Sequence, residues 1–206
     1  PKATFELGVD VRARVTILCD GVRGNVTKPL IERFALAPHG HPQQYAIGLK
    51  ELWEVPAGTM SAGSVCHTLG YPLRSEEFGG GFLYGLSDTL MSVGLVVGLD
   101  YQDPLFDPHM AFQAFKRHPA VARRLHGGRL IRFGAKALPE GGWNTIPRPY
   151  MPGALIAGDA ASMVNSLRLK GIHLAMRSGM LAAETAWDAL QTGDTSERQL
   201  RHYAER

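Results

Sequence analysis

The chain has 206 residues, enough for one large domain or two modest ones with a sizeable core. Hydrophobic residues make up 45%, charged residues 20% and aromatic residues 8%, which excludes a disordered, collagen-like or coiled-coil chain. The 22 Lys and Arg residues against 19 Asp and Glu residues leave a net charge of +3, so no nucleic-acid partner is expected.

Two cysteines, Cys19 and Cys66, each lie in an apolar, strand-like run, and no Cys-x-x-Cys pair is present to bind zinc or an iron–sulfur cluster. We expect both to be small core residues. No apolar stretch approaches the ~18 residues that a membrane-spanning helix needs. The chain begins with Pro1 and no signal sequence follows, which we interpret as a piece cut from a longer chain.

The first half of the chain predicts a strand, a turn and a helix, followed by a sheet. Residues 14–19 are rich in β-formers, Asp20-Gly21 is a turn signal, and 27–34 carry a short helical pattern. Four short apolar segments then follow, separated by Gly, Pro, Ser or Asp: 45–53, 64–69, 81–84 and 90–97. Apolar runs at this close spacing predict an antiparallel sheet.

The second half mixes helices and strands. Helix starts are marked by an acidic N-cap followed by proline, and helix ends by proline or glycine. The expected elements are a helix from Asp107-Pro108 to His118-Pro119, a strand over 128–138, a short buried strand over 154–159, and a helix over 171–190 that Gly193 ends. The sequence therefore predicts an α+β fold.

An acid at the end of a strand is the most informative local feature. Asp159, in Gly158-Asp159-Ala160-Ala161, can accept hydrogen bonds from a polyhydroxylated ligand chain, each contributing about 1.5–3 kcal/mol. The helix that starts near Lys170-Gly171 directs about half a positive charge at a ligand that becomes anionic on reduction, as a flavin does. The open alternative is that Asp159 only caps the next turn.

Two other glycine-containing segments are candidate binding sites. Gly21 and Gly24 would let the backbone approach a dinucleotide closely, and the alternative is a turn that only needs positive φ. The segment Phe78-Gly79-Gly80-Gly81-Phe82 combines bare backbone with aromatic rings, which suits a planar apolar ligand with carbonyl groups. The alternative there is a glycine bulge or hairpin.

Seven basic residues lie between Pro108 and Pro139 without any acid among them. They would attract anionic headgroups or an acidic protein, and the simpler alternative is a solvated helix face. His67 and His173 lie in apolar surroundings without a nucleophile beside them. We expect both to be hydrogen-bonded core residues.

Nine ordered segments carry a family pattern that spans nearly the whole chain. They are 48–53, 67–73, 79–84, 96–102, 118–119, 141–147, 158–161, 170–173 and 175–184. Taken together, these segments closely resemble the electron transfer flavoprotein–ubiquinone oxidoreductase family. So many segments in order are far more specific than any single glycine pattern.

This resemblance implies a flavoprotein that passes electrons from electron transfer flavoprotein to ubiquinone, using FAD and, in the full-length parent only, a [4Fe–4S] cluster. It implies a peripheral protein of the inner membrane, on the bacterial cytoplasmic face or the mitochondrial matrix face. It also implies glutathione-reductase-like FAD-domain segments over 1–28 and 136–206, and an antiparallel-sheet quinone-binding domain over 29–135. The electron chemistry would belong to the cofactors, so no side chain is expected to be catalytic.

The resemblance also assigns ligands residue by residue. Asp159 would lie near the ribityl chain of the flavin, and the helix from Gly171 would point at its pyrimidine end. The quinone head group would lie against Gly79 and Gly80, with Phe78 as an adjacent ring. The full set expected to bind FAD is Gly21, Gly24, Gly158, Asp159, Ala160, Asn165, Lys170 and Gly171.

Some positions depart from the family pattern. Neither cysteine matches a cluster ligand. Ile172 and Leu174 stand where the family usually has small hydroxyl residues, and Leu167-Arg168 where it has Pro-Lys. These departures leave two alternatives open: a related FAD-dependent isoprenoid or ring-modifying oxidoreductase, and a non-catalytic fragment that binds a membrane or a partner.

Overall fold

The structure is a computed structural model that describes residues 4–166 and 170–206. The chain forms two compact units, each assembled from segments that are distant in sequence. The first unit comprises Pro1–Pro38, Ile146–Met163 and Lys170–Arg206, and the second comprises His39–Thr145 and Val164–Leu169. Each unit has its own hydrophobic core.

A three-stranded sheet forms the centre of the first unit. Its strands are β1 (Thr16–Leu18), β7 (Tyr150–Met151) and β8 (Ala154–Ile156), in the order β1-β8-β7. β1 and β8 run parallel, whereas β7 and β8 run antiparallel. The strands predicted over 14–19 and 154–159 are confirmed, although each is only three residues long.

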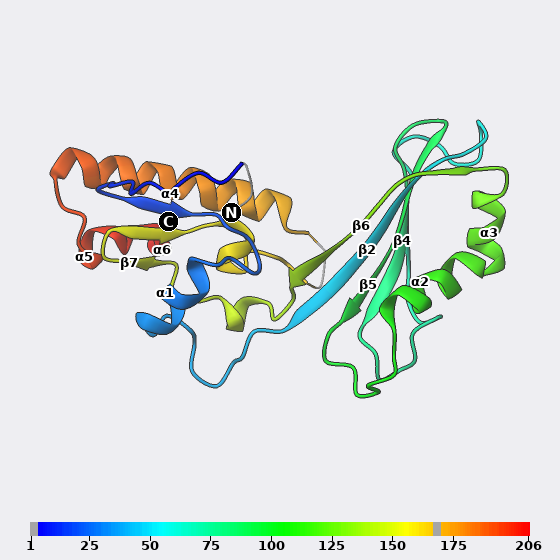
Figure 1. The fold of residues 1–206 in the computed structure, drawn as a ribbon, viewed down its shortest axis with the longest axis horizontal. Coiled ribbons are helices and arrows are strands. Elements are labelled where there is room, and N and C mark those ends of the chain that lie inside the picture. Colours follow the sequence, from blue (N-terminus) through cyan, green and yellow to red (C-terminus); the bar gives the residue numbers. More distant parts are fainter. Residues whose placement is uncertain (1–3, 167–169) are drawn as a thin grey trace. The chain divides into compact units, whose positions relative to one another are not determined.

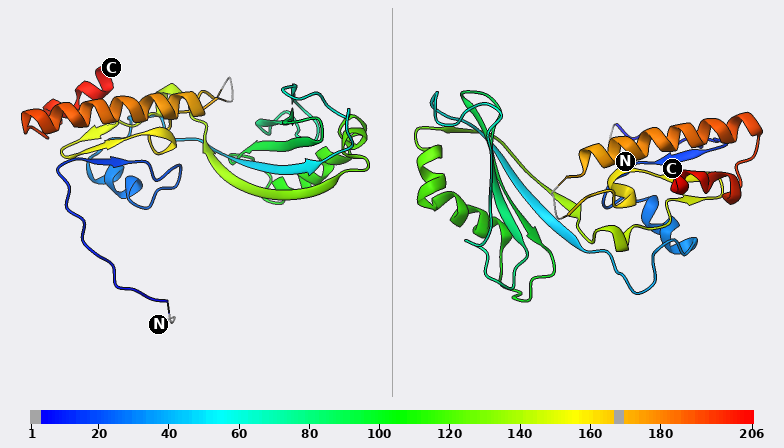
Figure 2. Two further views of the ribbon diagram at one scale, coloured as in Figure 1. Left: turned by 90° about the horizontal axis from the view of Figure 1, so that it is seen from above. Right: turned by 180° about the vertical axis from the view of Figure 1, so that it is seen from behind.

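Helices cover both faces of this sheet (Figure 2). On one face, α1 (Thr27–Arg33) packs in the cluster that contains Ile156. On the other face, α4 (Ile172–Thr192) packs in the cluster that contains Leu155. Successive residues of β8 point to opposite faces, so one short strand serves both layers.

The long helix α4 ends as predicted. Gly193 adopts a φ of 71°, the left-handed conformation that favours glycine after a helix. The short helices α5 (Glu197–Leu200) and α6 (His202–Glu205) follow. Tyr203 donates its hydroxyl to the Ile156 carbonyl oxygen at 3.0 Å, and burial raises the pKa of Tyr203 to about 12, so the donor stays protonated.

A five-stranded sheet forms the centre of the second unit (Figure 1). The strand order is β3-β4-β5-β2-β6, and every neighbouring pair is antiparallel. The strands are β2 (Tyr45–Glu54), β3 (Val65–Thr68), β4 (Gly79–Gly85), β5 (Leu90–Gly98) and β6 (Arg129–Pro139). The predicted antiparallel sheet is confirmed, and the strand predicted over 128–138 is its fifth member.

Two helices, α2 (Pro108–Arg117) and α3 (Pro119–Leu125), pack on one face of this sheet. The Asp107 carboxylate accepts a 2.8 Å hydrogen bond from the backbone N–H of His109, so α2 begins at the predicted cap. Pro119 ends α2 as predicted, but the chain continues at once into α3 because proline is favourable at the first position of a helix. A 3-10 turn, η1 (Trp143–Thr145), follows β6.

Several expectations about burial are wrong. Cys19 is exposed, because it follows the last residue of β1 where the chain turns into solvent, whereas Cys66 is half-buried and packs against the core. His67 is exposed on the edge strand β3, where its Nε2 lies 2.8 Å from the Tyr84 hydroxyl. His173 is exposed in the first turn of α4.

The basic stretch between Pro108 and Pro139 is divided between solvent and core. Arg123 is exposed on α3, as the solvated helix face requires, whereas Arg132 and Lys136 are exposed on strand β6. Lys116 is an exception, because its side chain is only 14% exposed and is paired with Glu51. Within residues 4–166 and 170–206, no helix combines the length and apolar character needed to cross a membrane.

Candidate functional site

The carboxyl end of β8 is fixed against α4. Gly158 has a φ of 65° and begins the 3-10 turn η2 (Gly158–Ala161). Its N–H donates a 2.9 Å hydrogen bond to Ser178 Oγ, which in turn donates to the Ala175 carbonyl oxygen at 2.9 Å. A Cβ on Gly158 would lie 3.6 Å from the Ala175 Cβ, so the positive φ, rather than lack of space, favours glycine.

Asp159 is half-buried directly after this glycine. Among the residues that the structure describes, its carboxylate has no hydrogen-bond or ion-pair partner. It is the backbone oxygen of Asp159 that accepts the Ser162 N–H, at 3.0 Å, so the capping alternative is not observed. Ala160, next along the turn, is 7% exposed and belongs to the core. The carboxylate can therefore accept hydrogen bonds from a ligand without breaking an existing contact.

No side chain among the described residues caps the N-terminus of α4. Gly171 is the N-cap residue, and the helix that follows is 21 residues long. Such a helix concentrates about half a positive charge at its uncapped N–H groups. Asn165 and Lys170, which we expect to bind FAD, are both exposed. Leu167-Arg168, which stand where the family usually has Pro-Lys, lie outside the described residues.

Asp20 organises the turn after β1. Its carboxylate accepts hydrogen bonds from the backbone N–H groups of Val26 and Thr27, both at 3.1 Å, and from the Thr27 hydroxyl. Partial burial raises the pKa of Asp20, but these hydrogen bonds outweigh it and hold the pKa below its ordinary value. A Cβ on Gly24 would lie 2.1 Å from the Asp20 Cγ, whereas Gly21 has a φ of 78° and open space around it. Both glycines thus have local roles, and a cofactor contact stays a prediction.

Gly79 and Gly80 begin strand β4 in regular register with β5. They therefore form neither a bulge nor a hairpin turn. On the other side, the ladder between β3 and β4 ends at the pair of Thr68 and Gly81. The backbone of Gly79 and Gly80 extends beyond that last pair.

Close backbone contacts require both glycines. A Cβ on Gly79, where φ is 151°, would lie 2.1 Å from the Val96 carbonyl oxygen. A Cβ on Gly80 would lie 2.5 Å from the Thr68 carbonyl oxygen. The preceding residue, Phe78, is 56% exposed, while its carbonyl oxygen accepts a 2.8 Å hydrogen bond from the end of β5. The aromatic ring is thus presented at the surface from a fixed backbone.

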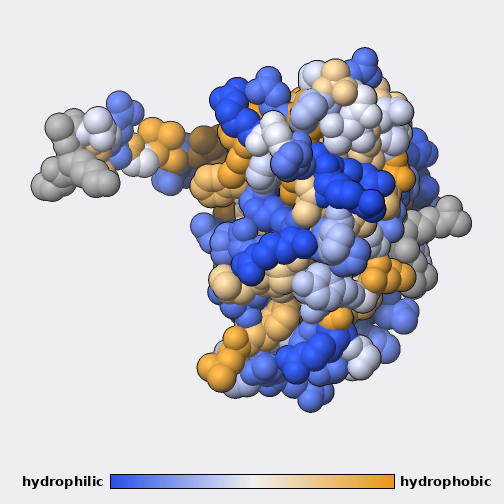
Figure 3. Space-filling model, turned by 90° about the vertical axis from the view of Figure 1, so that its right-hand side faces the viewer, coloured by the Kyte–Doolittle hydropathy of each residue, from blue (hydrophilic) through white to orange (hydrophobic). Residues whose placement is uncertain are grey.

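Exposed apolar side chains gather at this end of the five-stranded sheet. They lie in the loops after β3, before β4, after β5 and before α2, and are Leu69, Tyr71, Phe78, Leu99 and Leu105. We call these five residues the apolar rim. Figure 3 shows apolar side chains among polar ones along the lower edge of this unit. Exposed apolar side chains that gather at one end of a sheet favour an interaction site there.

The sequence did not predict two hydroxyl groups that lie at the candidate flavin and quinone sites. Ser178 fixes Gly158, and the signal for it is a hydroxyl residue on the buried stripe of α4, which also carries Thr185. Thr68 Oγ1 is buried and has no hydrogen-bond partner in the described part of the chain. It lies 2.7 Å from where a Cβ on Gly81 would be, and no sequence pattern points to it.

Flavin-dependent enzymes share this fold. A geranylgeranyl bacteriochlorophyll reductase-like protein from Thermoplasma acidophilum matches with a TM-score of 0.76 at 20% identity, over 95% of this chain and 46% of that one. The flavin-dependent brominase Bmp2 matches with a TM-score of 0.66 at 17% identity, over 97% of this chain and 49% of that one. The chain therefore has a mixed α/β fold of a class that is found in FAD-dependent enzymes.

Closer relatives are found by sequence. Residues 45–138 match the family described as ETF-QO, ubiquinone-binding. The mitochondrial electron transfer flavoprotein-ubiquinone oxidoreductase of Oryza sativa subsp. japonica is 44% identical over 198 residues, which is 95% of this chain and 34% of that protein. The Homo sapiens protein of the same name is 45% identical over 192 residues, 92% of this chain and 31% of that protein. The resemblance predicted from the sequence is confirmed, and the chain spans about a third of the length of these relatives.

Proposed function

We propose that this chain is part of a flavoprotein that transfers electrons from reduced electron transfer flavoprotein to ubiquinone. The first unit would supply glutathione-reductase-like parts of an FAD domain, and the second would be the quinone-binding domain. The observation that carries the proposal is the Phe78-Gly79-Gly80 segment, which lies beyond the β3 ladder and inside the residues that match the ubiquinone-binding family.

On the quinone side, bare backbone and an exposed ring are the groups that bind the head group. Gly80 belongs to the hydrogen-bonded ladder with β5, so it is the backbone N–H of Gly79, which faces away from β5 beyond the end of the β3 ladder, that would donate to a quinone carbonyl oxygen. The exposed ring of Phe78 packs against the flat head group. The apolar rim then offers a path for an isoprenoid tail.

On the flavin side, the first unit has two features that fit FAD. The carboxylate of Asp159, which has no partner among the described residues, can accept hydrogen bonds from the ribityl hydroxyls. The N-terminus of α4, which no described side chain caps, favours negative charge at the pyrimidine end. The further residues proposed to bind FAD are Gly21, Gly24, Gly158, Ala160, Asn165, Lys170 and Gly171. When bound, FAD supplies the electron transfer, and the protein positions it and adjusts its potential.

The iron–sulfur cluster and the membrane belong to the proposal for the longer protein. In the part of the chain that the structure describes, no group of three His, Cys, Asp or Glu residues is placed to hold a metal ion. The apolar rim supports peripheral contact with a membrane, which would be the inner membrane on its bacterial cytoplasmic or mitochondrial matrix face.

Phe78→Ala tests the quinone site in a full-length protein that carries this chain. We expect the KM for a short-chain ubiquinone to rise about two- to tenfold, because the stacked ring is lost, while reduction of the flavin by electron transfer flavoprotein stays unchanged. Phe5→Ala, which removes another exposed ring, is the matched control. Equal loss of both activities would argue against this site. Gly80→Val is less suitable, because its Cβ would displace the Thr68 backbone.

A further inference from the structure

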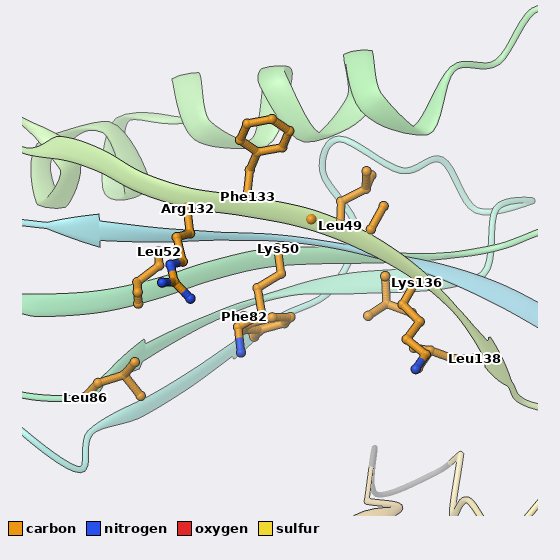
Figure 4. A pocket seen from close by; sticks show the side chains of 13 residues that line it. Leu49, Lys50, Leu52, Phe82, Leu86, Arg132, Phe133, Lys136 and Leu138 are labelled. Atoms are coloured by element: carbon orange, nitrogen blue, oxygen red, sulfur yellow. The ribbon is translucent and has the colours of Figure 1, made fainter. Parts of the chain in front are cut away.

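The face of the five-stranded sheet opposite α2 carries an apolar trough (Figure 4). The trough has a volume of about 610 Å³ and lies over β2, β4, β5 and β6. Its apolar lining includes Leu52, Phe82, Leu86, Val96 and Leu138. Sites for small molecules commonly have volumes of about 300–1,000 Å³ and mainly apolar walls.

Strand alternation places three cations on this trough. Lys50 of β2 pairs with Gly134 of β6, and Arg132 and Lys136 lie two residues to either side of that glycine, so all three side chains share a face. Figure 4 shows them on the side of the sheet away from the helices, whereas Phe133 points the other way. The trough therefore combines an apolar floor with a line of positive charge.

Two glycines leave room beside these cations. Across the ladder between β2 and β6, Gly48 faces Lys136 and Gly134 faces Lys50. A Cβ on Gly134 would meet nothing within 4 Å, and one on Gly48 would make only contacts of 3.4–3.9 Å. Unlike Gly79 and its neighbour, these glycines are not required by close backbone contacts. Their effect is to deepen the trough.

The three cations have no acidic partner in the structure as described. No hydrogen bond or ion pair joins Lys50, Arg132 or Lys136 to a carboxylate in residues 4–166 and 170–206. The two acids of β2, Glu51 and Glu54, pair with other cations at 2.6 and 2.9 Å. Like charges on neighbouring positions of a sheet repel each other, so an anion among them would be stabilising.

We propose that this trough binds an anionic amphiphile, with a single apolar chain along the floor and an anionic head group among the three cations. A neutral ligand fits less well, since it would cover the cations without neutralising them. The trough shares no residue with the Phe78–Gly80 segment, so this site is separate from the proposed quinone site.

Four probes test the chemistry by calorimetry on the 206-residue chain. Dodecyl phosphate and dodecanoate, used below their micelle-forming concentrations, carry both the chain and the negative charge. Dodecyltrimethylammonium carries the chain with the opposite charge, and inorganic phosphate carries the charge alone. We expect the two anionic amphiphiles to bind at least about tenfold more tightly than the other two probes, and to bind more weakly at high salt.

Variants test the position. Gly134→Val fills the trough without a clash at Cβ, and the double variant Arg132→Glu with Lys136→Glu reverses two charges. Each should weaken the binding of dodecyl phosphate by about tenfold or more. Arg123→Glu, an exposed cation on α3, is the matched charge control and should leave binding unchanged. Far-UV circular dichroism establishes that every variant is folded.

Three results would overturn the proposal. Equal binding of the anionic and cationic dodecyl probes would mean adsorption to apolar surface. Unchanged affinity in folded Gly134→Val and in the charge-reversed variant would place any binding elsewhere. Binding to vesicles of anionic phospholipid without binding of the monomeric amphiphiles would identify a bilayer surface as the partner. None of these results depends on quinone binding, which Phe78→Ala tests separately.

Discussion

The ammonium of Lys116 lies 2.6 Å from Oε1 of Glu51, across the helix–sheet interface of the second unit. The two side chains are only 14% and 7% exposed, and Trp53 Nε1 donates a 2.7 Å hydrogen bond to the other carboxylate oxygen. The ammonium also lies 4.9 Å from the centre of the Phe112 ring. The pair therefore fixes how α2 sits on the sheet that carries the candidate quinone site.

Replacing one member of this pair should lower the stability of the fold more than replacing both. Lys116→Met leaves the Glu51 carboxylate buried without its cation, and we expect a loss of about 3–5 kcal/mol in the free energy of unfolding. The double variant Lys116→Met with Glu51→Gln should recover most of that loss, because it removes the charge and keeps an acceptor for Trp53. Denaturant unfolding, followed by circular dichroism, measures the free energy of unfolding of the unmodified chain and of both variants. A loss below about 1 kcal/mol in the single variant would match an exposed pair and contradict this role.

Local signals were sufficient to predict most of the fold. The acid and proline at residues 107 and 108 predict the start of α2, because the Asp107 carboxylate accepts its hydrogen bond from a backbone N–H only two residues further along the chain. The apolar runs between 45 and 97 predict four strands, and Gly193 predicts the end of α4, for equally local reasons. Such features depend on backbone conformation and on periodicity over a few residues.

The remaining features depend on partners that are distant in sequence. Lys116 and Glu51 are 65 positions apart, so their pairing requires knowledge of how α2 packs. The exposure of Cys19 depends on where β1 stops, and that of His67 on β3 being an edge strand. The trough also escaped prediction, because its cations come from two strands whose register is set by a long connection.

Asp159→Ala should lower flavin occupancy without destabilising the fold. Its carboxylate has no partner among the described residues, so we expect a change of less than about 0.5 kcal/mol in the free energy of unfolding. Flavin absorbance of the purified full-length protein, compared with thermal unfolding of the 206-residue chain, separates the two effects.

Ser178→Ala provides the contrast to Asp159→Ala. It leaves the Gly158 N–H without its acceptor and should cost about 1–3 kcal/mol in stability. Full flavin occupancy in Asp159→Ala would remove that aspartate from the proposed FAD site. A large loss of stability in the same variant would show instead that its role is structural.

Glu140 should make the second unit less stable as pH rises. Burial raises the pKa of this carboxyl, and its Oε2 is buried without a hydrogen-bond partner in the described residues. The folded state therefore binds the proton more tightly than the unfolded state. Stability is unaffected below about pH 4.5, the ordinary glutamate pKa, and falls as pH rises from there through the raised pKa of the folded state.

Glu140→Gln tests this dependence, because it removes the ionisable group and keeps the shape of the side chain. The Tm of the variant should equal that of the unmodified chain at pH 4 and exceed it at pH 7, since only the unmodified chain then carries a buried negative charge. Glu6→Gln, in the exposed N-terminal segment, is the matched control and should leave the Tm profile unchanged. A Tm difference that is the same at both pH values would show that the effect of Glu140→Gln is one of packing rather than of charge.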